Sequence, residues 1–265
     1  MFEIAENAWH RGPDMPTWRF GHGIAVVSGR VFVIGGITRE GISKSVTAFS
    51  IEKNEWEEIP PMSMNRSRPG VGVVSDKIFV MGGHNGREIT NTCEAFDVEE
   101  NRWEHITPMK SKRNNMGVAV IGDHIIVIGG RNSDSGTLRT VEELDTKTNT
   151  WTMLSPMSIA RSGMAIAVID DHIWTFGGFD GNRIHDLIEE FDIWKNTWMR
   201  SDIVMTSPRF SAKAVVVDDK VFIIGGTADS YNAVEEVEVF DWRRKTWEKA
   251  PPMSVPRVFH ATIGI

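Results

Sequence analysis

Short apolar runs and polar turns alternate along the whole chain, and this pattern repeats with a period of about 47 residues. In one period, residues 70–75 are small and apolar, residues 77–81 are rich in β-forming side chains, and residues 93–98 alternate around Phe96. A fourth run surrounds Trp103, and turn-forming residues separate the four runs. Each period therefore predicts four short antiparallel strands.

Three series of marker residues keep the same period. The tryptophans are Trp9, Trp56, Trp103, Trp151, Trp198 and Trp247. The diglycines are Gly35-Gly36, Gly82-Gly83, Gly129-Gly130, Gly177-Gly178 and Gly225-Gly226. An arginine precedes each diglycine at a fixed distance, and this arginine row consists of Arg19, Arg66, Arg113, Arg161 and Arg209, with Arg257 continuing it. We expect structural roles for the glycines, where a backbone bends or approaches another closely, and for the tryptophans, as apolar contacts between repeats.

One four-stranded sheet cannot bury both of its faces, so repeats of this kind must stack on their neighbours. Radial stacking produces a β-propeller. The predicted fold is an all-β propeller with five complete four-stranded blades and parts of a sixth blade from both ends of the chain. The single domain, residues 1–265, divides into repeats at about 19–65, 66–112, 113–160, 161–208 and 209–256, with the partial blade at 1–18 and 257–265.

The two ends of the chain supply different parts of the sixth blade. Alignment with a complete repeat places Phe2-Glu3-Ile4 on residues 96–98 and Trp9 on Trp103, which predicts a third and a fourth strand. Val258–Ile265 matches a first strand, so a second strand and its diglycine are missing. The favoured explanation is that the chain is a segment of a longer protein, and the alternative is a native ring that stays open.

Composition narrows the classes of partner and the cellular compartment that are expected for the protein. The formal net charge of −7 and the pI near 5.6 argue against general affinity for nucleic acid or for membranes. The single cysteine, Cys93, excludes an internal disulfide. This favours a reducing, cytoplasmic location.

The periodic motifs resemble those of kelch-repeat propellers over essentially the whole chain. The matching motifs are the diglycine, the tryptophan that follows it, and a Pro-Met dipeptide before the row arginine. These dipeptides are Pro61-Met62, Pro108-Met109, Pro156-Met157 and Pro252-Met253. The chain departs from the family at the tyrosines usually found in the second and third strands, because Tyr231 is its only tyrosine.

The loops at residues 84–86 and 179–181, together with the Pro-Pro-Met stretches at 60–62 and 251–253, are most similar to BTB-kelch proteins. This resemblance implies a substrate-receptor propeller that binds a short, acidic peptide of a target protein and performs no chemistry. BTB and BACK domains, absent from this chain, would recruit a cullin-3 ubiquitin ligase. The alternatives are a scaffold that binds actin, as some kelch proteins do, and a sugar mutarotase or epimerase of the kelch type.

Other kelch enzymes need residues that this sequence lacks. The copper radical oxidases require two tyrosines, and the Glu-x-x-x-Asp-x-x-x-His motif of the nitrile-forming specifier proteins does not occur. No histidine lies at a metal-ligand spacing from another histidine or from Cys93, so no metal and no cofactor are expected. His22 and His260 follow row arginines at the same distance, which predicts that both face the central channel.

The arginine row has two interpretations. Guanidinium groups gathered at one channel mouth would capture acidic or phosphorylated side chains of a partner. Alternatively, the row arginines would pair with the repeated glutamates, which are Glu94, Glu142, Glu189 and Glu238. Repetition in every unit favours the structural role for some of them. Arg68 is extra to the row and favours binding, and Arg113 with Asn114-Asn115 is the next candidate.

The loops after the diglycines vary most between repeats, which is typical of recognition surfaces on a constant scaffold. Asn85 and Asp180 fit either recognition or turn chemistry, because Asn and Asp are turn formers. The remaining candidates for partner contact are Arg39, Arg87, Arg183 and Tyr231.

Overall fold

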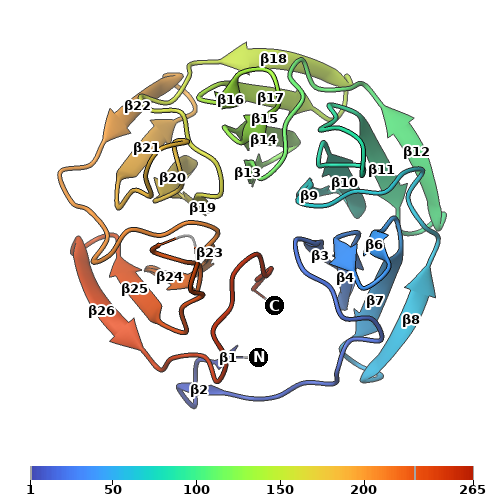
Figure 1. The fold of residues 1–265 in the computed structure, drawn as a ribbon, viewed down its shortest axis with the longest axis horizontal. Helices are drawn as coiled ribbons and strands as arrows, with labels where there is room; N and C mark the ends of the chain where they lie inside the picture. Colours follow the sequence, from blue (N-terminus) through green and yellow to red (C-terminus); the bar gives the residue numbers. More distant parts are fainter. Residues whose placement is uncertain (1, 230, 265) are drawn as a thin grey trace.

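The computed structural model describes residues 2–229 and 231–264, and these residues form five four-stranded antiparallel sheets arranged in a ring (Figure 1). Met1 and Ile265, which belong to the predicted partial blade, lie outside the described residues. The predicted all-β propeller with five complete blades is therefore confirmed.

Within each blade, the strands lie side by side in sequence order. Blade 1 consists of β3 (Gly23–Val27), β4 (Arg30–Ile34), β7 (Val46–Ser50) and β8 (Glu55–Ile59). Blade 2 consists of β9 (Gly70–Val74), β10 (Lys77–Met81), β11 (Cys93–Asp97) and β12 (Arg102–Ile106). Blade 3 consists of β13 (Gly117–Ile121), β14 (His124–Ile128), β17 (Val141–Asp145) and β18 (Thr150–Leu154). Blade 4 consists of β19 (Ala165–Ile169), β20 (His172–Phe176), β21 (Ile188–Asp192) and β22 (Thr197–Arg200). Blade 5 consists of β23 (Lys213–Val217), β24 (Lys220–Ile224), β25 (Val237–Asp241) and β26 (Thr246–Ala250).

Three small hairpins complete the described strands. One pairs β1 (Phe2–Glu3) with β2 (Ala8–Trp9), and the other two lie in loops after diglycines. These two are β5 (Ile37–Thr38) with β6 (Gly41–Ile42), and β15 (Arg131–Asn132) with β16 (Gly136–Thr137).

The turns between first and second strands follow from their residue types. Ser75 and Asp76 both have positive φ angles, and Asp170 and Asp171 repeat this conformation in blade 4. Two successive positive φ angles are typical of the two-residue turn that matches the twist of a β-hairpin. These aspartates therefore stabilise the turns of the hairpins.

The sixth position of the ring is only partly filled. Phe2 pairs with Trp9 in the same register as Phe96 with Trp103, so β1 and β2 are short third and fourth strands, as predicted. The prediction of a first strand over Val258–Ile265 is wrong, because the described residues 258–264 form none. A strand there needs a hydrogen-bonded neighbour, and no described residue supplies the second strand. The C-terminal segment instead runs to the centre of the ring (Figure 1).

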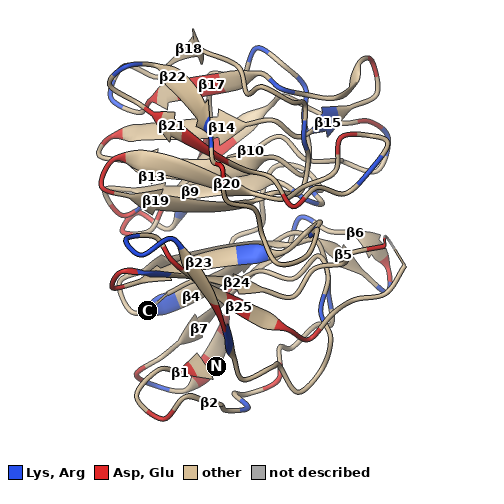
Figure 2. Ribbon diagram, turned by 90° about the vertical axis from the view of Figure 1, so that its left-hand side faces the viewer, with Lys and Arg blue, Asp and Glu red and all other residues tan. Residues whose placement is uncertain are grey.

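The core lies between the blades. Each pair of adjacent complete blades shares one cluster of buried apolar side chains, such as Phe32 of blade 1 against Phe96 of blade 2. The cluster beyond blade 5 is smaller and contains only Ile224, Val237 and Met253 as buried members among the described residues. Charged residues stand mainly in loops and at strand ends (Figure 2). Within the described residues, no helix has the length and apolar character needed to span a bilayer.

Candidate functional site

The row arginines are buried, with exposed fractions of 0 to 6 % for Arg19 through Arg209. Each guanidinium donates to the carbonyl of the first glycine in its own blade, at 2.7 Å for Arg66 and Gly82. The carbonyl of Arg66 in turn accepts from the amide of Gly36 in the preceding blade, at 2.8 Å. This bond recurs at Arg113, Arg161, Arg209 and Arg257. The row therefore links each blade to its neighbour.

Four row arginines also pair with the repeated glutamates. Arg66 lies 3.0 Å from Glu94, and both side chains are buried. The corresponding pairs are Arg113 with Glu142, Arg161 with Glu189, and Arg209 with Glu238. Burial lowers the pKa of Arg161, and the neighbouring Glu189 opposes this shift. Buried pairs of this kind are costly to break, because an unpaired charge stays inside the protein.

Arg19 is the exception in the row. Thr47 stands where the other complete blades have glutamate, and the Arg19 guanidinium donates to the carbonyls of Gly35 and Ser45. Burial lowers the pKa of Arg19. Neither this side chain nor those of Arg66, Arg113, Arg161 and Arg209 is open to a partner, so their expected binding role gives way to the structural alternative.

The diglycines fit this arrangement closely. Gly129 and Gly130 have φ angles of +57° and +94°, which favour glycine. A Cβ on Gly129 would lie 2.3 Å from the carbonyl oxygen of Arg161, the next row arginine along the chain. At the first glycine of every other pair, a Cβ would lie at a similar distance from the carbonyl oxygen of the next row arginine. The indole N–H groups of Trp9, Trp103, Trp151 and Trp198 donate to loop carbonyls near the end of the preceding blade. The equivalent atoms of Trp56 and Trp247 have no hydrogen-bond partner among the described residues.

A series of main-chain hydrogen bonds runs around the axis of the propeller. It joins one residue from each of six positions, which we call the axial ring: Gly21, Arg68, Asn115, Gly163, Ser211 and Phe259. The amide of Arg68 donates to Gly21 at 2.6 Å, and the same step continues through Ser211. The amide of Gly21 donates to the carbonyl of Phe259 at 2.8 Å, so the C-terminal segment supplies the member of this series at the sixth position. All six φ angles lie between +51° and +61°.

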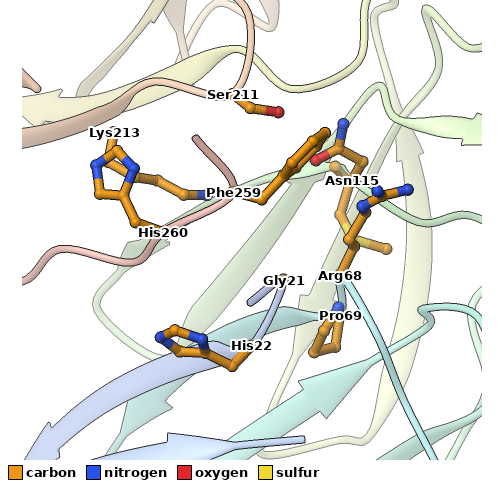
Figure 3. A pocket seen from close by; sticks show the side chains of 10 residues that line it. Gly21, His22, Arg68, Pro69, Asn115, Ser211, Lys213, Phe259 and His260 are labelled. Atoms are coloured by element: carbon orange, nitrogen blue, oxygen red, sulfur yellow. The ribbon is translucent and has the colours of Figure 1, made fainter. Parts of the chain in front are cut away.

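The axial ring borders a polar pocket, which we call the axial pocket (Figure 3). The Arg68 guanidinium lies over the ring of Phe259 at 4.2 Å. Lys213 and Asn115 also line the pocket, and no Asp or Glu does so among the described residues. Its volume of about 30 Å³ holds one or two water molecules or a single carboxylate group.

His22 and His260 both line the axial pocket, which confirms their predicted position. Burial, aided by the charges of Arg19 and Lys213, lowers the pKa of His22 to about 4. Burial and the charges of Lys213 and Arg257 lower the pKa of His260 to about 3. Both imidazoles are therefore neutral near pH 7.

Sequence reasoning identified Arg68 and Asn115 but missed Lys213, Ser211 and Phe259. The signal for Lys213 lay in the repeat itself, where Gly23, Gly70, Gly117 and Ala165 occupy the equivalent first-strand position. A long basic side chain among small residues marks a position that is not constrained by packing against a following complete blade.

The loops after the diglycines begin beside the axial ring, as bridges between Ser67 and His84 and between Ser162 and Phe179 show. Asn85 and Asp180 hold these loops by accepting main-chain amides two and three residues ahead. Burial opposes the pKa shift of Asp180, but the amides and His185 outweigh it and lower that pKa to about 2. Both side chains therefore stabilise the turns of their own loops.

Four predicted contact residues project from the same loops. The side chains of Arg39, Arg87 and Arg183 are exposed, and Tyr231 is 91 % exposed. The loops that carry them begin beside the axial ring.

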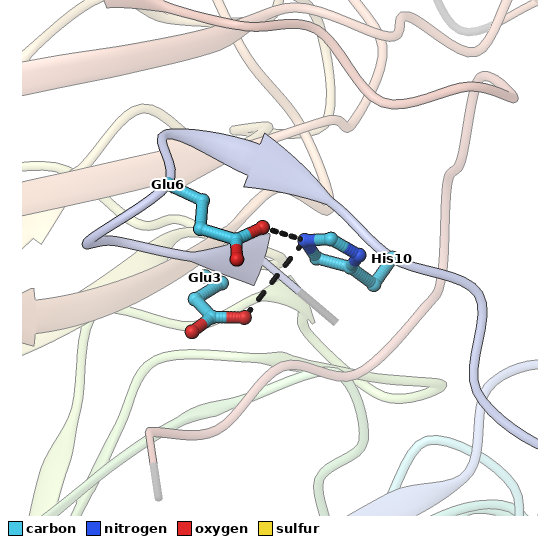
Figure 4. Close-up of side chains that lie close together, drawn as sticks. All are labelled: Glu3, Glu6 and His10. Atoms are coloured by element: carbon cyan, nitrogen blue, oxygen red, sulfur yellow. Dashed lines mark ion pairs between the residues drawn. The ribbon is translucent and has the colours of Figure 1, made fainter.

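A second group of polar side chains lies at the N-terminal hairpin (Figure 4). Glu3, Glu6 and His10 are exposed, and their potential ligand atoms lie within 4.8 Å of one another. His10 Nε2 lies 2.9 Å from Glu6 and 3.8 Å from Glu3. The sequence prediction concerned only histidine–histidine and histidine–cysteine spacings, so it did not include this histidine–carboxylate group.

Comparison with known proteins agrees with the repeat motifs. The KLHDC2/KLHL20/DRC7 Kelch-repeats domain matches residues 1–116 and 70–263. A search of curated proteins finds no match. A propeller of this kind suits a protein-interaction module, because loops from every blade meet on one face. With matches that together span nearly its whole length, the chain belongs to the kelch-repeat family.

Proposed function

We propose that this propeller is the target-recognition part of a BTB-kelch adaptor for a cullin-3 ubiquitin ligase, and that its axial pocket binds an acidic side chain of a short target peptide. The observation that carries the peptide-binding part is the charge of the pocket. Arg68 and Lys213 line it without a carboxylate among the described lining residues. The protein as a whole is acidic, with a formal net charge of −7, so this is a local positive site.

The environment of the two cations favours an anionic ligand. Burial lowers the pKa of Arg68, as does the charge of Arg131, and burial also lowers the pKa of Lys213. A carboxylate that entered the pocket would stabilise the charged form of each group. Arg68 offers a planar fork for two hydrogen bonds to such a ligand.

The small volume of the pocket suits the tip of one side chain. The remainder of the peptide would lie over the surrounding loops, where Arg39, Arg87, Arg183 and Tyr231 are exposed. Recognition would then combine one anchored carboxylate with contacts to loops that differ between blades.

The peptide-binding test uses the purified propeller and a peptide array in which each Asp or Glu peptide has an Asn or Gln counterpart. We expect binding to acidic members and loss of binding on amide replacement. Arg68→Glu should abolish binding of the selected peptides, and Lys213→Met should weaken it about tenfold or more, as for a lost charged hydrogen bond.

Arg102→Glu, on the outer strand β12, is the matched control and should bind normally. Thermal unfolding must show that Arg68→Glu stays folded, because its side chain also packs on Phe259. Equal binding of acidic and amide peptides, or normal binding by both pocket variants, would refute this site.

The adaptor part of the proposal is supported by the resemblance of the loops to those of BTB-kelch proteins. We expect the protein expressed in its own cells to co-purify with cullin-3, while the isolated 265-residue propeller does not bind cullin-3 directly. Absence of cullin-3 from such complexes would leave a peptide-binding propeller with a different output.

A further inference from the structure

The residues beside the axial ring differ in character from blade to blade. In each complete blade, the residue after the row arginine forms an antiparallel bridge with the residue after the diglycine, and we call these two residues the rim pair. From blade 1 to blade 5, the rim pairs are Phe20 with Ile37, Ser67 with His84, Asn114 with Arg131, Ser162 with Phe179, and Phe210 with Thr227. Aromatic residues therefore occur in the rim pairs of blades 4, 5 and 1, whereas those of blades 2 and 3 are polar or basic.

Three aromatic rings, which we call the aromatic row, form a series that begins at the axial pocket. Phe259 lines the pocket, and its ring centroid lies 5.7 Å from that of Phe210. The Phe210 ring lies 5.8 Å from the ring of Phe179. All three residues are partly exposed. A Cβ on Gly163 would lie 2.5 Å from the Phe210 ring and 2.9 Å from the side-chain nitrogen of Asn115, so the Phe210 ring lies close to the pocket.

The bridge at the Phe210 position forms without an aromatic side chain in other blades. Ser67 and Ser162 stand at the equivalent positions of blades 2 and 4 and form the same bridge. The Phe210 ring thus adds apolar surface that the repeat itself does not need. Partly exposed apolar surface that adjoins a polar pocket favours contact with a partner.

The side of the pocket formed by blades 2 and 3 is basic. Burial, together with the charge of Arg131, lowers the pKa of Arg68, so these two cations lie near each other. Arg131 is exposed. The Arg68 guanidinium lies over the Phe259 ring, and that ring also contacts Phe210. A cationic surface and an aromatic surface therefore meet at Phe259.

We propose that the axial pocket and the aromatic row together select an extended peptide segment in which an aromatic residue lies two positions from the acidic residue, in either chain direction. Side chains two positions apart in an extended chain project from the same side, about 7 Å apart. The acidic side chain would bind Arg68, and the aromatic side chain would pack against Phe210. The inference rests on the proposed peptide-binding function and adds the second anchor residue to it.

Three peptides with blocked termini test this proposal on the intact chain. The reference, Gly-Phe-Ser-Asp-Ser-Phe-Gly, has phenylalanine two positions to either side of its only charge. Its isomer, Gly-Ser-Phe-Asp-Phe-Ser-Gly, has the same composition, but its phenylalanines point away from the side of the aspartate. The third peptide is the reference with asparagine in place of aspartate. Titration of isotope-labelled protein by NMR measures the affinities, and the reference should bind about fivefold or more tightly than either other peptide.

Variants of the protein locate the aromatic anchor. Phe210→Ser introduces the residue that blades 2 and 4 have at this position, and it should abolish the preference for the reference over its isomer. Phe210→Leu keeps an apolar side chain and should retain the preference. Trp194→Ala is the matched control, because Trp194 is 79 % exposed and lies at the end of blade 4 opposite to the diglycine. It should leave the preference unchanged.

The outcomes separate this inference from the proposed function. Equal affinity for the reference and its isomer, or a preference that persists in a folded Phe210→Ser variant, would overturn the aromatic anchor. The acidic pocket would still stand if the asparagine peptide bound more weakly. Equal binding of the aspartate and asparagine peptides, or no binding of the reference, would overturn the inference at the pocket itself.

Discussion

The guanidinium of Arg161 donates to the carbonyl of Gly177 and to the side chains of Thr175 and Glu189, and all of these groups are buried. This set of contacts lies within blade 4, while the Arg161 carbonyl binds Gly130 of blade 3. One residue therefore shapes its own blade and joins it to the preceding blade. Substitution at such a position affects the whole interface.

Arg161→Met should destabilise the protein by about 3–5 kcal/mol, because it leaves Glu189 buried without its partner. Urea denaturation measures the loss. Arg183→Met, at an exposed loop position, is the control and should change stability by less than about 0.5 kcal/mol. The double variant Arg161→Met, Glu189→Leu should recover part of the loss. A single variant as stable as the control would contradict the buried pair.

The two axial histidines predict a pH dependence. Their pKa values in the folded protein, about 4 for His22 and about 3 for His260, lie below the ordinary value of 6.5. The unfolded chain therefore binds more protons between pH 6.5 and 4, so stability should fall as the pH decreases through this range. Denaturation midpoints from pH 7.5 to 5 measure the slope.

The variant His22→Asn, His260→Asn isolates this effect. Its stability should change less between pH 6.5 and 5 than that of the wild type. Asp180 and Asp192, with pKa values of about 2, lose stabilising interactions only at lower pH, so they contribute little in this window. An unchanged slope in the double variant would assign the pH dependence to other groups.

At the scale of the elements, the diglycine ends the second strand of every complete blade and receives the backbone of the next row arginine. The strands themselves contain the alternation expected from the sequence, with buried and partly exposed residues taking turns along β3, β9 and β19. Strand placement was therefore predictable. The close approach of one blade to the next depends on the missing Cβ atoms.

Two glycines of blade 3 separate backbone strain from crowding. Gly129 and Gly122 have the same φ of +57°, but a Cβ on Gly122 would meet no atom within 4 Å. Gly122→Ala should cost about 1 kcal/mol through φ strain alone. Gly129→Ala should cost at least about 2 kcal/mol more, because the added Cβ meets the Arg161 carbonyl. Urea denaturation of both variants gives the difference, and equal losses would refute the crowding argument.

At the scale of the whole molecule, the ring closes through short contacts at its incomplete position. Phe259 accepts from Gly21, packs against Phe210 and lies beneath the Arg68 guanidinium. On its blade 5 side, the incomplete position has a smaller buried cluster than the interfaces between complete blades have. The two blades that flank the incomplete position should therefore open most easily.

Deletion of residues 258–265 should speed amide exchange in blades 1 and 5 more than in blade 3, because each blade contacts mainly its neighbours. Hydrogen exchange with mass spectrometry measures this gradient. Val255→Ala, an exposed substitution on the same segment, serves as the control. Equal acceleration in all blades would show that the ring unfolds as one cooperative unit.

The sequence by itself determined the repeat, the strands, the diglycine turns and the identity of β1 and β2 as remnants of a blade. These features are local or periodic, and periodicity appears in the order of the residues. The residue order also supported both interpretations of the arginine row, because an arginine and a glutamate at fixed spacing can form an internal pair or bind an external ligand.

Only the tertiary structure decided between those interpretations, because burial depends on how blades stack. It placed Arg66 inside the protein and Arg68, two residues later, at the axial pocket. It also brought Lys213 and Phe259 to the same pocket from other parts of the chain. The C-terminal segment matched a first strand in sequence but could not become one, since a strand forms only where a neighbour completes its hydrogen bonds.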